Sequence, residues 1–137
     1  MNALYVKGAE RMLAAALLGT LPAGGTLTAA LVSTGYSQSL SADEFFDDIS
    51  AYVLGTPQAL ANITISDGKL DADDSTFAAV AAGDTAEAAV LYMNTGDPAT
   101  SWLLARIDQL TSFPYATDDG DIVVRWDNGT YKIVALV

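Results

Sequence analysis

The side chains of this chain that are best suited to chemistry are aspartates, four of which fall within one short stretch, DGKLDADD. They are Asp67, Asp71, Asp73 and Asp74. Carboxylate oxygens at this density are the ligands that Ca²⁺ prefers in proteins. The stretch is therefore a candidate metal site, and Asp71, Asp73 and Ser75 stand at alternate positions, as ligands do in an EF-hand loop.

The match to a calcium loop is incomplete. The glycine needed at the turn is missing, and no glutamate closes the loop. The simpler interpretation is an acidic turn surrounded by water, and it applies equally to a second acidic group formed by Asp118, Asp119 and Asp121. We therefore expect no metal and no cofactor, and keep the first four aspartates as the only metal candidates.

Catalysis finds little support in the composition. The chain has no histidine and no cysteine, which removes Ser-His-Asp and Cys-His nucleophile systems as well as ordinary zinc sites. A pair of carboxylates can cleave glycosidic bonds without either residue type. Nothing in the sequence places two carboxylates across a cleft, however, so we predict that the protein is not an enzyme.

The charge of the chain limits its partners. Its formal net charge is −11 at pH 7, which repels nucleic-acid phosphates and anionic lipid surfaces. We therefore expect neither a nucleic-acid nor a membrane partner. The same charge would complement a basic patch on a protein partner.

Two apolar runs of strand length, residues 87–93 and 102–107, form the centre of the predicted fold. The segment NTGDPATS between them supplies turn residues, so they should form a hairpin. The first run is apolar on both faces, which is typical of a central strand covered on both sides. In the segment TLTAALVST, we expect Leu27, Ala29 and Leu31 to face the core.

Further strands are expected along the rest of the chain. One strand should end at a break over residues 55–57 and another should run over residues 59–65, followed by a turn at residues 66–68. Near the C-terminus, residues 122–126 and 131–136 flank an Asn-Gly pair, which predicts a hairpin with a type I′ turn. The fold class is therefore mainly β, a β-sandwich or jelly-roll-like single domain with a short N-terminal helix.

Residues 1–20 are predicted to form a helical segment beginning near Ala9, and residues 21–137 the β-sandwich domain. A secretory signal is the alternative interpretation of this segment, but Glu10 interrupts its basic region. The apolar stripe of the helix exceeds what one short helix can hide, which predicts an assembly contact. Deletion of residues 1–18 should then abolish that contact and leave the β-domain folded. The candidate contact residues are Leu4, Tyr5, Met12, Leu13, Leu17 and Trp102.

Trp102 has three interpretations. Because it lies inside a predicted strand, core packing comes first, an interface second and a platform for sugar rings third.

Four segments of the chain together form a recognisable, collinear pattern: NALYVKGAERML, DDISAYVLGTPQAL, DGKLDADDSTFAAVAAGDTAEAAVLYMNTGDPATSWLLARID and GDIVVRWDNGTYKIVALV. They resemble a family of small virion structural proteins of tailed bacteriophages, often encoded close to the major capsid protein. The resemblance implies a β-sandwich decoration, or cement, protein on the capsid exterior, which binds the major capsid protein and forms a homodimer or homotrimer. Residues 13–25 depart from the family's pattern because they are unusually rich in alanine and leucine.

Two other functions stay open. The protein could belong to the tail or the head–tail junction of a virus particle, where far fewer copies are needed than on a shell. It could instead be a calcium-dependent carbohydrate-binding module that uses the acidic turn and an exposed tryptophan.

Overall fold

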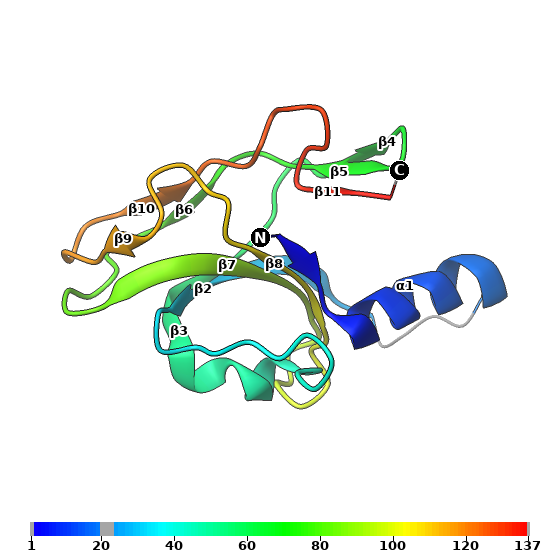
Figure 1. Ribbon diagram of the computed structural model, residues 1–137, viewed down its shortest axis with the longest axis horizontal. Coiled ribbons are helices and arrows are strands. Elements are labelled where there is room, and N and C mark those ends of the chain that lie inside the picture. Colours follow the sequence, from blue (N-terminus) through cyan, green and yellow to red (C-terminus); the bar gives the residue numbers. More distant parts are fainter. Residues whose placement is uncertain (1, 20–23, 137) are drawn as a thin grey trace.

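The fold is mainly β and sandwich-like, as the sequence predicted, and the described residues include one α-helix, near the N-terminus. The computed structural model describes residues 2–19 and 24–136. A long antiparallel sheet forms one layer, and two small sheets lie across one of its faces (Figure 1). The α-helix extends from the end of the molecule where the three-stranded small sheet lies.

The main sheet has the strand order β1-β8-β7-β2-β3, and β9 pairs with β7. Its strands are β1 (Ala3–Leu4), β2 (Thr26–Ser33), β3 (Val53–Ala59), β7 (Thr85–Asn94), β8 (Leu103–Ile107) and β9 (Tyr115–Ala116). The small sheets pair β6 (Ser75–Phe77) with β10 (Ile122–Val124), and β5 (Lys69–Asp71) with both β4 (Thr64–Ser66) and β11 (Val134–Ala135). The helices are α1 (Val6–Leu18) and the short 3₁₀ turns η1 (Phe46–Asp48) and η2 (Ser50–Tyr52).

The central hairpin is confirmed as β7 and β8. The two strands are antiparallel, with Ala89 opposite Ile107 and Tyr92 opposite Leu103. Strand β7 is buried on both faces, because one face packs under the small sheets and the other under the 3₁₀ turns. Its continuous apolar run therefore reflects a strand covered on both sides.

The core has one part on each side of the main sheet. On the side of the small sheets, Leu91 of β7 packs in a cluster with Phe77 and Trp126. On the other side, Val90 packs with Tyr5 and Ile49. The many alanines of β2 and β7 let both layers approach the sheet closely, which leaves the packing to a few large side chains.

Strand β2 has the same two-sided burial. Ala29 and Leu31 face the first cluster, as predicted, and Leu27 is partly buried against it. The alternate residues Ala30 and Val32 are equally buried in the second cluster.

The predicted C-terminal hairpin is wrong. Strand β10 pairs with β6, and β11 pairs with β5, so the two runs join different sheets. Neither Asn128 nor Gly129 has positive φ, which a type I′ turn requires at both positions. The buried Trp126 holds the end of β10 beside β6 and so prevents a tight turn back to β11. Its backbone N–H donates to Asp74 Oδ1 at 3.0 Å, and its indole N–H donates to Ser75 Oγ at 3.2 Å.

Two smaller predictions also need correction. The expected break at residues 55–57 lies inside β3, where Gly55 has a φ of 67° and the pairing with β2 shifts register. The expected strand at residues 59–65 is divided, because β3 ends at Ala59 and β4 begins at Thr64. A positive φ at Gly55 lets the strand bulge without ending, which the sequence pattern does not reveal. The turn at residues 66–68 is confirmed between β4 and β5, with Asp67 and Gly68 both at positive φ.

Candidate assembly surface

The N-terminal residues are part of the folded core. Strand β1 pairs with β8, with Leu4 opposite Ala105, and the Tyr5 N–H donates to the Leu104 carbonyl at 3.0 Å. The Tyr5 side chain is fully buried, and its hydroxyl lies 2.8 Å from that of Tyr36. The Tyr36 hydroxyl donates to Asp43 Oδ2, so it accepts its second hydrogen bond from Tyr5.

Burial makes these tyrosines harder to ionise than an exposed tyrosine. It raises the pKa of Tyr5 to about 12, with the nearby Asp43 carboxylate adding to the effect and the hydrogen bond to Tyr36 opposing it. Burial also raises the pKa of Tyr36, and the hydrogen bond to Asp43 raises it further. The pair therefore acts as a structural anchor that fixes the start of α1, and not as an acid or base at neutral pH.

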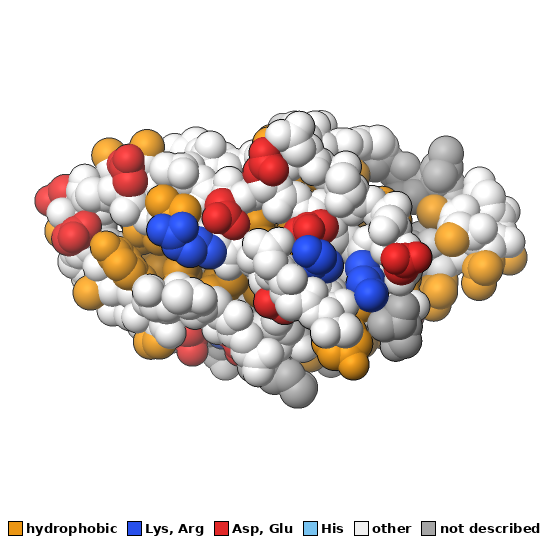
Figure 2. All heavy atoms as spheres, turned by 90° about the horizontal axis from the view of Figure 1, so that it is seen from above, with side chains coloured by type: hydrophobic (Ala, Val, Ile, Leu, Met, Phe, Trp, Pro, Cys, Tyr) orange, Lys and Arg blue, Asp and Glu red, His pale blue; other side chains and the backbone are white. Residues whose placement is uncertain are grey.

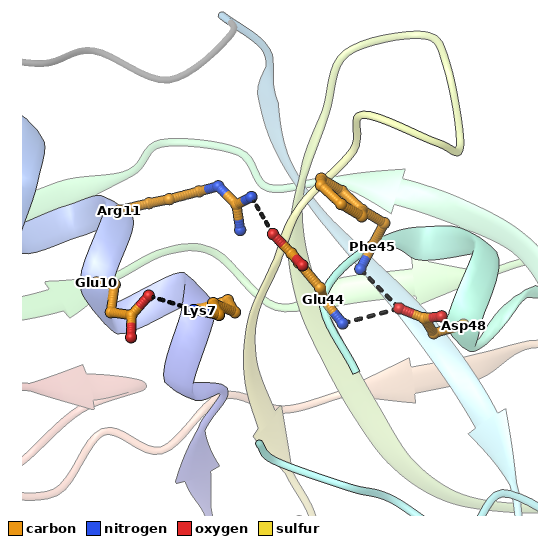
Figure 3. Close-up of polar contacts among 6 residues, drawn as sticks. All are labelled: Lys7, Glu10, Arg11, Glu44, Phe45 and Asp48. Atoms are coloured by element: carbon orange, nitrogen blue, oxygen red, sulfur yellow. Dashed lines mark hydrogen bonds and ion pairs between the residues drawn. The ribbon is translucent and has the colours of Figure 1, made fainter. Parts of the chain in front are cut away.

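The first turns of α1 lie directly on β8. A Cβ atom at Gly8 would stand 2.3 Å from the Leu103 carbonyl oxygen, so only glycine allows this approach. One turn later, the Arg11 guanidinium pairs with Glu44 at 2.5 Å and lies 5.0 Å from the centre of the Phe45 ring (Figure 3). These contacts fix the first half of the helix against the body of the protein.

The loop that receives Arg11 is itself held in place. The Asp48 carboxylate accepts the backbone N–H groups of Glu44 and Phe45 at 2.8 and 2.9 Å (Figure 3). The Asp48 side chain thus provides hydrogen-bond acceptors for the backbone N–H groups that precede η1. On the exposed face of α1, Lys7 and Glu10 form an ion pair at 2.9 Å.

The second half of α1 leaves the body of the protein (Figure 1). Residues 12–18, MLAAALL, carry no charge. Leu13, Leu17 and Leu18 are 55%, 74% and 78% exposed, and apolar side chains gather at this end of the molecule in Figure 2. A helix that is apolar on all sides is normally buried, and an isolated helix of this length is marginal in water. This end of α1 is therefore an uncovered surface.

An apolar groove of about 580 Å³ lies between α1 and the small sheet of β4, β5 and β11. Lys69 is the single charged residue in its lining among the described residues. Trp102 lines it, and the buried indole Nε1 has no hydrogen-bond partner in the part of the chain that the structure describes. The helix contributes Met12, Ala15 and Ala16, and the opposite wall contributes Ile65, Leu70, Val134 and Leu136.

The six candidate contact residues divide into three groups. Leu13 and Leu17 are exposed on the free half of α1, and Met12 lines the groove while also packing against the core. Leu4 is partly buried in β1. Tyr5 is fully buried within the chain, which corrects the expectation that its side chain forms a contact surface. Trp102 is 6% exposed, in agreement with core packing as its first interpretation, and it also lines the groove.

The groove itself is not visible in the sequence. Its far wall comes from Ile65 and Leu136, which are 78% and 62% exposed and stand more than forty positions from α1. The sequence signal for this wall is the apolar Ile65 between the polar residues Thr64 and Ser66. The structure places all three residues in β4 and exposed.

The candidate metal ligands do not converge. Asp71 pairs with Lys132 at 3.1 Å, Asp73 accepts a hydrogen bond from Asn62, and Asp74 caps the Trp126 backbone N–H. Asp67 stands in the β4–β5 turn at a φ of 51°. Within residues 2–19 and 24–136, no three acidic, histidine or cysteine side chains are grouped as metal ligands.

Comparison of the chain with protein-family models, with curated proteins and with solved structures finds no match. The resemblance to phage virion proteins therefore depends on the quoted segments alone. In the described part of the chain, no helix has the length and apolar character needed to cross a bilayer.

Proposed function

We propose that this protein is a capsid decoration, or cement, protein of a tailed bacteriophage. It binds the outer surface of the assembled shell of major capsid protein and stabilises it, and it performs no catalysis. The observation that supports this proposal best is the uncovered apolar end of α1 with its adjoining groove, on a chain whose net charge is −11. Exposed apolar surface of this kind is typical of proteins that assemble.

A cement protein acts through buried interface. Because it binds the assembled shell and not the dissociated subunits, it shifts the equilibrium towards the shell by mass action. Many symmetric copies multiply a modest contact. The acidic remainder of the surface keeps the protein soluble and would complement basic regions of the shell.

The test is the location and number of copies in virus particles from cells that encode this chain. Quantitative mass spectrometry of purified particles should find about as many copies as a decorated shell offers sites, which is on the order of hundreds. Electron cryo-microscopy should place the chain outside the shell. Absence from the particles would contradict the proposal, and so would density confined to the tail or the head–tail junction.

A binding assay with purified shells and variants of the protein tests the same proposal. Deletion of residues 1–18 is unsuitable, because it would remove β1 and the buried Tyr5 from the core. Replacement of Leu13 and Leu17 by glutamate changes only exposed side chains and should release the protein from purified shells. The variant must remain folded by circular dichroism, and undiminished binding would show that α1 has no part in shell attachment.

The calcium-dependent carbohydrate-binding alternative receives no support from Asp71, Asp73 and Asp74, whose carboxylates contact a lysine, an asparagine and a backbone N–H instead of one another. Calorimetry with Ca²⁺ separates the two functions, since the decoration proposal expects no heat of binding.

A further inference from the structure

The loop that links β10 to β11 (Figure 1) brings together the groups needed to hydrolyse one asparagine side chain. Asn128 is exposed there, outside the helices and strands, and the next residue is Gly129, which has no side chain to hinder approach to the Asn128 amide. We propose that Asn128 is a site of spontaneous modification, at which the Gly129 backbone nitrogen attacks the side-chain carbonyl carbon and the amide becomes a carboxylate.

The reaction has two steps, and water is the only other reactant. In the first step a bond forms between the Gly129 nitrogen and Asn128 Cγ while the Cγ–Nδ2 bond breaks. The proton of the Gly129 N–H ends on the leaving nitrogen, which departs as ammonia and leaves a succinimide ring. In the second step water opens the ring at either of its carbonyls, which gives aspartate or isoaspartate. No oxidant or reductant is needed.

The attacking nitrogen is held by Asp127. The Gly129 N–H donates to Asp127 Oδ1 at 2.9 Å and makes no backbone hydrogen bond within residues 2–19 and 24–136. The carboxylate can therefore take the proton as the nitrogen attacks, as a general base does. No strand pairing has to break for the nitrogen to reach Asn128 Cγ, because residues 127–131 are exposed and lie outside the strands.

Lys132 acts on the carbonyl that is attacked. Its Nζ donates to Asn128 Oδ1 at 3.3 Å, so its positive charge lies beside the oxygen that becomes negative in the tetrahedral intermediate. Lys132 is also the rival nucleophile, but its Nζ pairs with Asp71 Oδ2 at 3.1 Å. An ammonium in an ion pair has no lone pair with which to attack. The geometry therefore assigns the attack to Gly129 and the stabilisation of the oxyanion to Lys132.

The change of charge stays local to the loop. Trp126 and Ile133, which are 3% and 5% exposed, fix the two ends of the loop in the core. The new carboxylate at position 128 remains beside Lys132, which can pair with it as well as with Asp71. The product is therefore the folded protein with one additional negative charge, and this form accumulates with the age of the molecule.

The other asparagines of the chain lack this arrangement. Asn62 and Asn94 are exposed, but they precede Ile63 and Thr95, whose β-branched side chains crowd the nitrogen that would attack. Asn2 Oδ1 already accepts two backbone N–H groups of the segment that follows β8. These residues are internal controls for the modification of Asn128.

The inference does not rest on the proposed function, and its test needs no shell, so the two can fail separately. The purified full chain is incubated at neutral pH in water enriched in heavy oxygen and then mapped by mass spectrometry of its peptides. Asn128 should be converted to a mixture of labelled aspartate and isoaspartate, while Asn62 and Asn94 stay intact. Isoelectric focusing should show one new, more acidic form.

Variants test the groups at each reactant. Lys132→Ala should slow the conversion about tenfold, which is less than the loss at a buried oxyanion donor because Lys132 is partly exposed. Lys132→Arg keeps a cationic donor and should restore most of the rate. Lys69→Ala is the matched control, since it removes the same charge from a lysine that is not bonded to Asn128, and it should leave the rate unchanged.

Asp127→Ala should also slow the conversion, because it removes the base. Its control is Asp118→Ala, since Asp118 Oδ1 accepts the Gly120 N–H at 3.1 Å in the same way but far from Asn128 in the sequence. The inference would be overturned by an intact Asn128, by equal conversion of Asn62 or Asn94, or by a cross-link between Lys132 and Asn128. A rate that neither Lys132→Ala nor Asp127→Ala changes would overturn it as well.

Discussion

Gly8 shows how one residue decides the position of an entire helix. Alanine is normally favoured over glycine inside a helix by about 1 kcal/mol. Here the added Cβ would lie 2.3 Å from the Leu103 carbonyl oxygen, which is backbone and cannot move aside. The contact therefore reverses the usual preference.

We expect Gly8→Ala to lower the free energy of unfolding by about 1–3 kcal/mol, as overpacking of a close contact does. Urea denaturation followed by circular dichroism measures the change. The matched control is Gly24→Ala, since a Cβ at Gly24 meets nothing within 4 Å and should leave stability nearly unchanged. Equal stability of Gly8→Ala and the wild type would contradict the packing of α1 on β8.

Buried tyrosines predict a loss of stability in alkali. Burial raises the pKa of Tyr5 to about 12, and the pKa values of Tyr36 and Tyr92 are raised for the same reason. Above an ordinary tyrosine pKa of 10.0 the unfolded chain releases protons that the folded chain retains. The unfolded state then binds fewer protons, so stability falls as pH rises, whereas below that pH both states are protonated and the contribution is constant.

The free energy of unfolding should fall above pH 10 by up to about 1.4 kcal/mol per pH unit for each such tyrosine. Urea denaturation at a series of pH values, with tyrosinate absorbance recorded in parallel, measures both the slope and the ionisation. Tyr5→Phe should reduce the slope. An unchanged slope in that variant, or ionisation of Tyr5 well before unfolding, would contradict its burial.

At the scale of elements, two Asp/Asn–Gly turns with similar sequences have different structures. Gly68 follows Asp67 in a genuine hairpin turn between β4 and β5, with a φ of 71°. Gly129 follows Asn128 but has no positive φ, and its N–H donates to Asp127 Oδ1 at 2.9 Å. The conformational need for glycine is therefore present at the first position and absent at the second.

Gly68→Ala should lower the free energy of unfolding by about 1–2 kcal/mol, because alanine is strained at positive φ. Gly129→Ala should cost less than about 0.5 kcal/mol, since its Cβ would meet only the end of the exposed Asp127 side chain. Thermal denaturation of the two variants side by side gives the comparison. A larger loss of stability for Gly129→Ala than for Gly68→Ala would contradict the structure and favour the type I′ turn that the sequence predicted.

At the scale of the whole molecule, the net charge of −11 opposes the compact state through self-repulsion. Raising NaCl from about 20 mM to about 300 mM shortens the Debye length below the size of the molecule. The melting temperature should therefore rise with salt. Sodium chloride is preferable to sulfate, which strengthens apolar burial regardless of charge; a melting temperature independent of NaCl would show that the charges are too dispersed to matter.

Local sequence pattern was enough to predict strand pairing and burial where the residues of a segment themselves determine them. The continuous apolar run of β7, joined to β8 by a turn rich in Gly, Pro and Asp, predicted the central hairpin. The alternation in β2 placed Ala29 and Leu31 correctly, though it did not show that Ala30 and Val32 are equally buried. The charge-free end of α1 was also evident, and Leu13 and Leu17 are exposed there.

The sequence by itself determined the mainly β class, the central hairpin, the turn at Asp67 and Gly68, and the apolar N-terminal helix. Only the tertiary structure decided that β10 and β11 pair with β6 and β5 instead of each other, and that Tyr5 is buried. It alone also set Ile65 and Leu136 across a groove from α1. The reason is that these outcomes depend on competition between distant partners: burying Trp126 against Ser75 outweighs a local turn preference, and no short window of sequence contains both sides of that comparison.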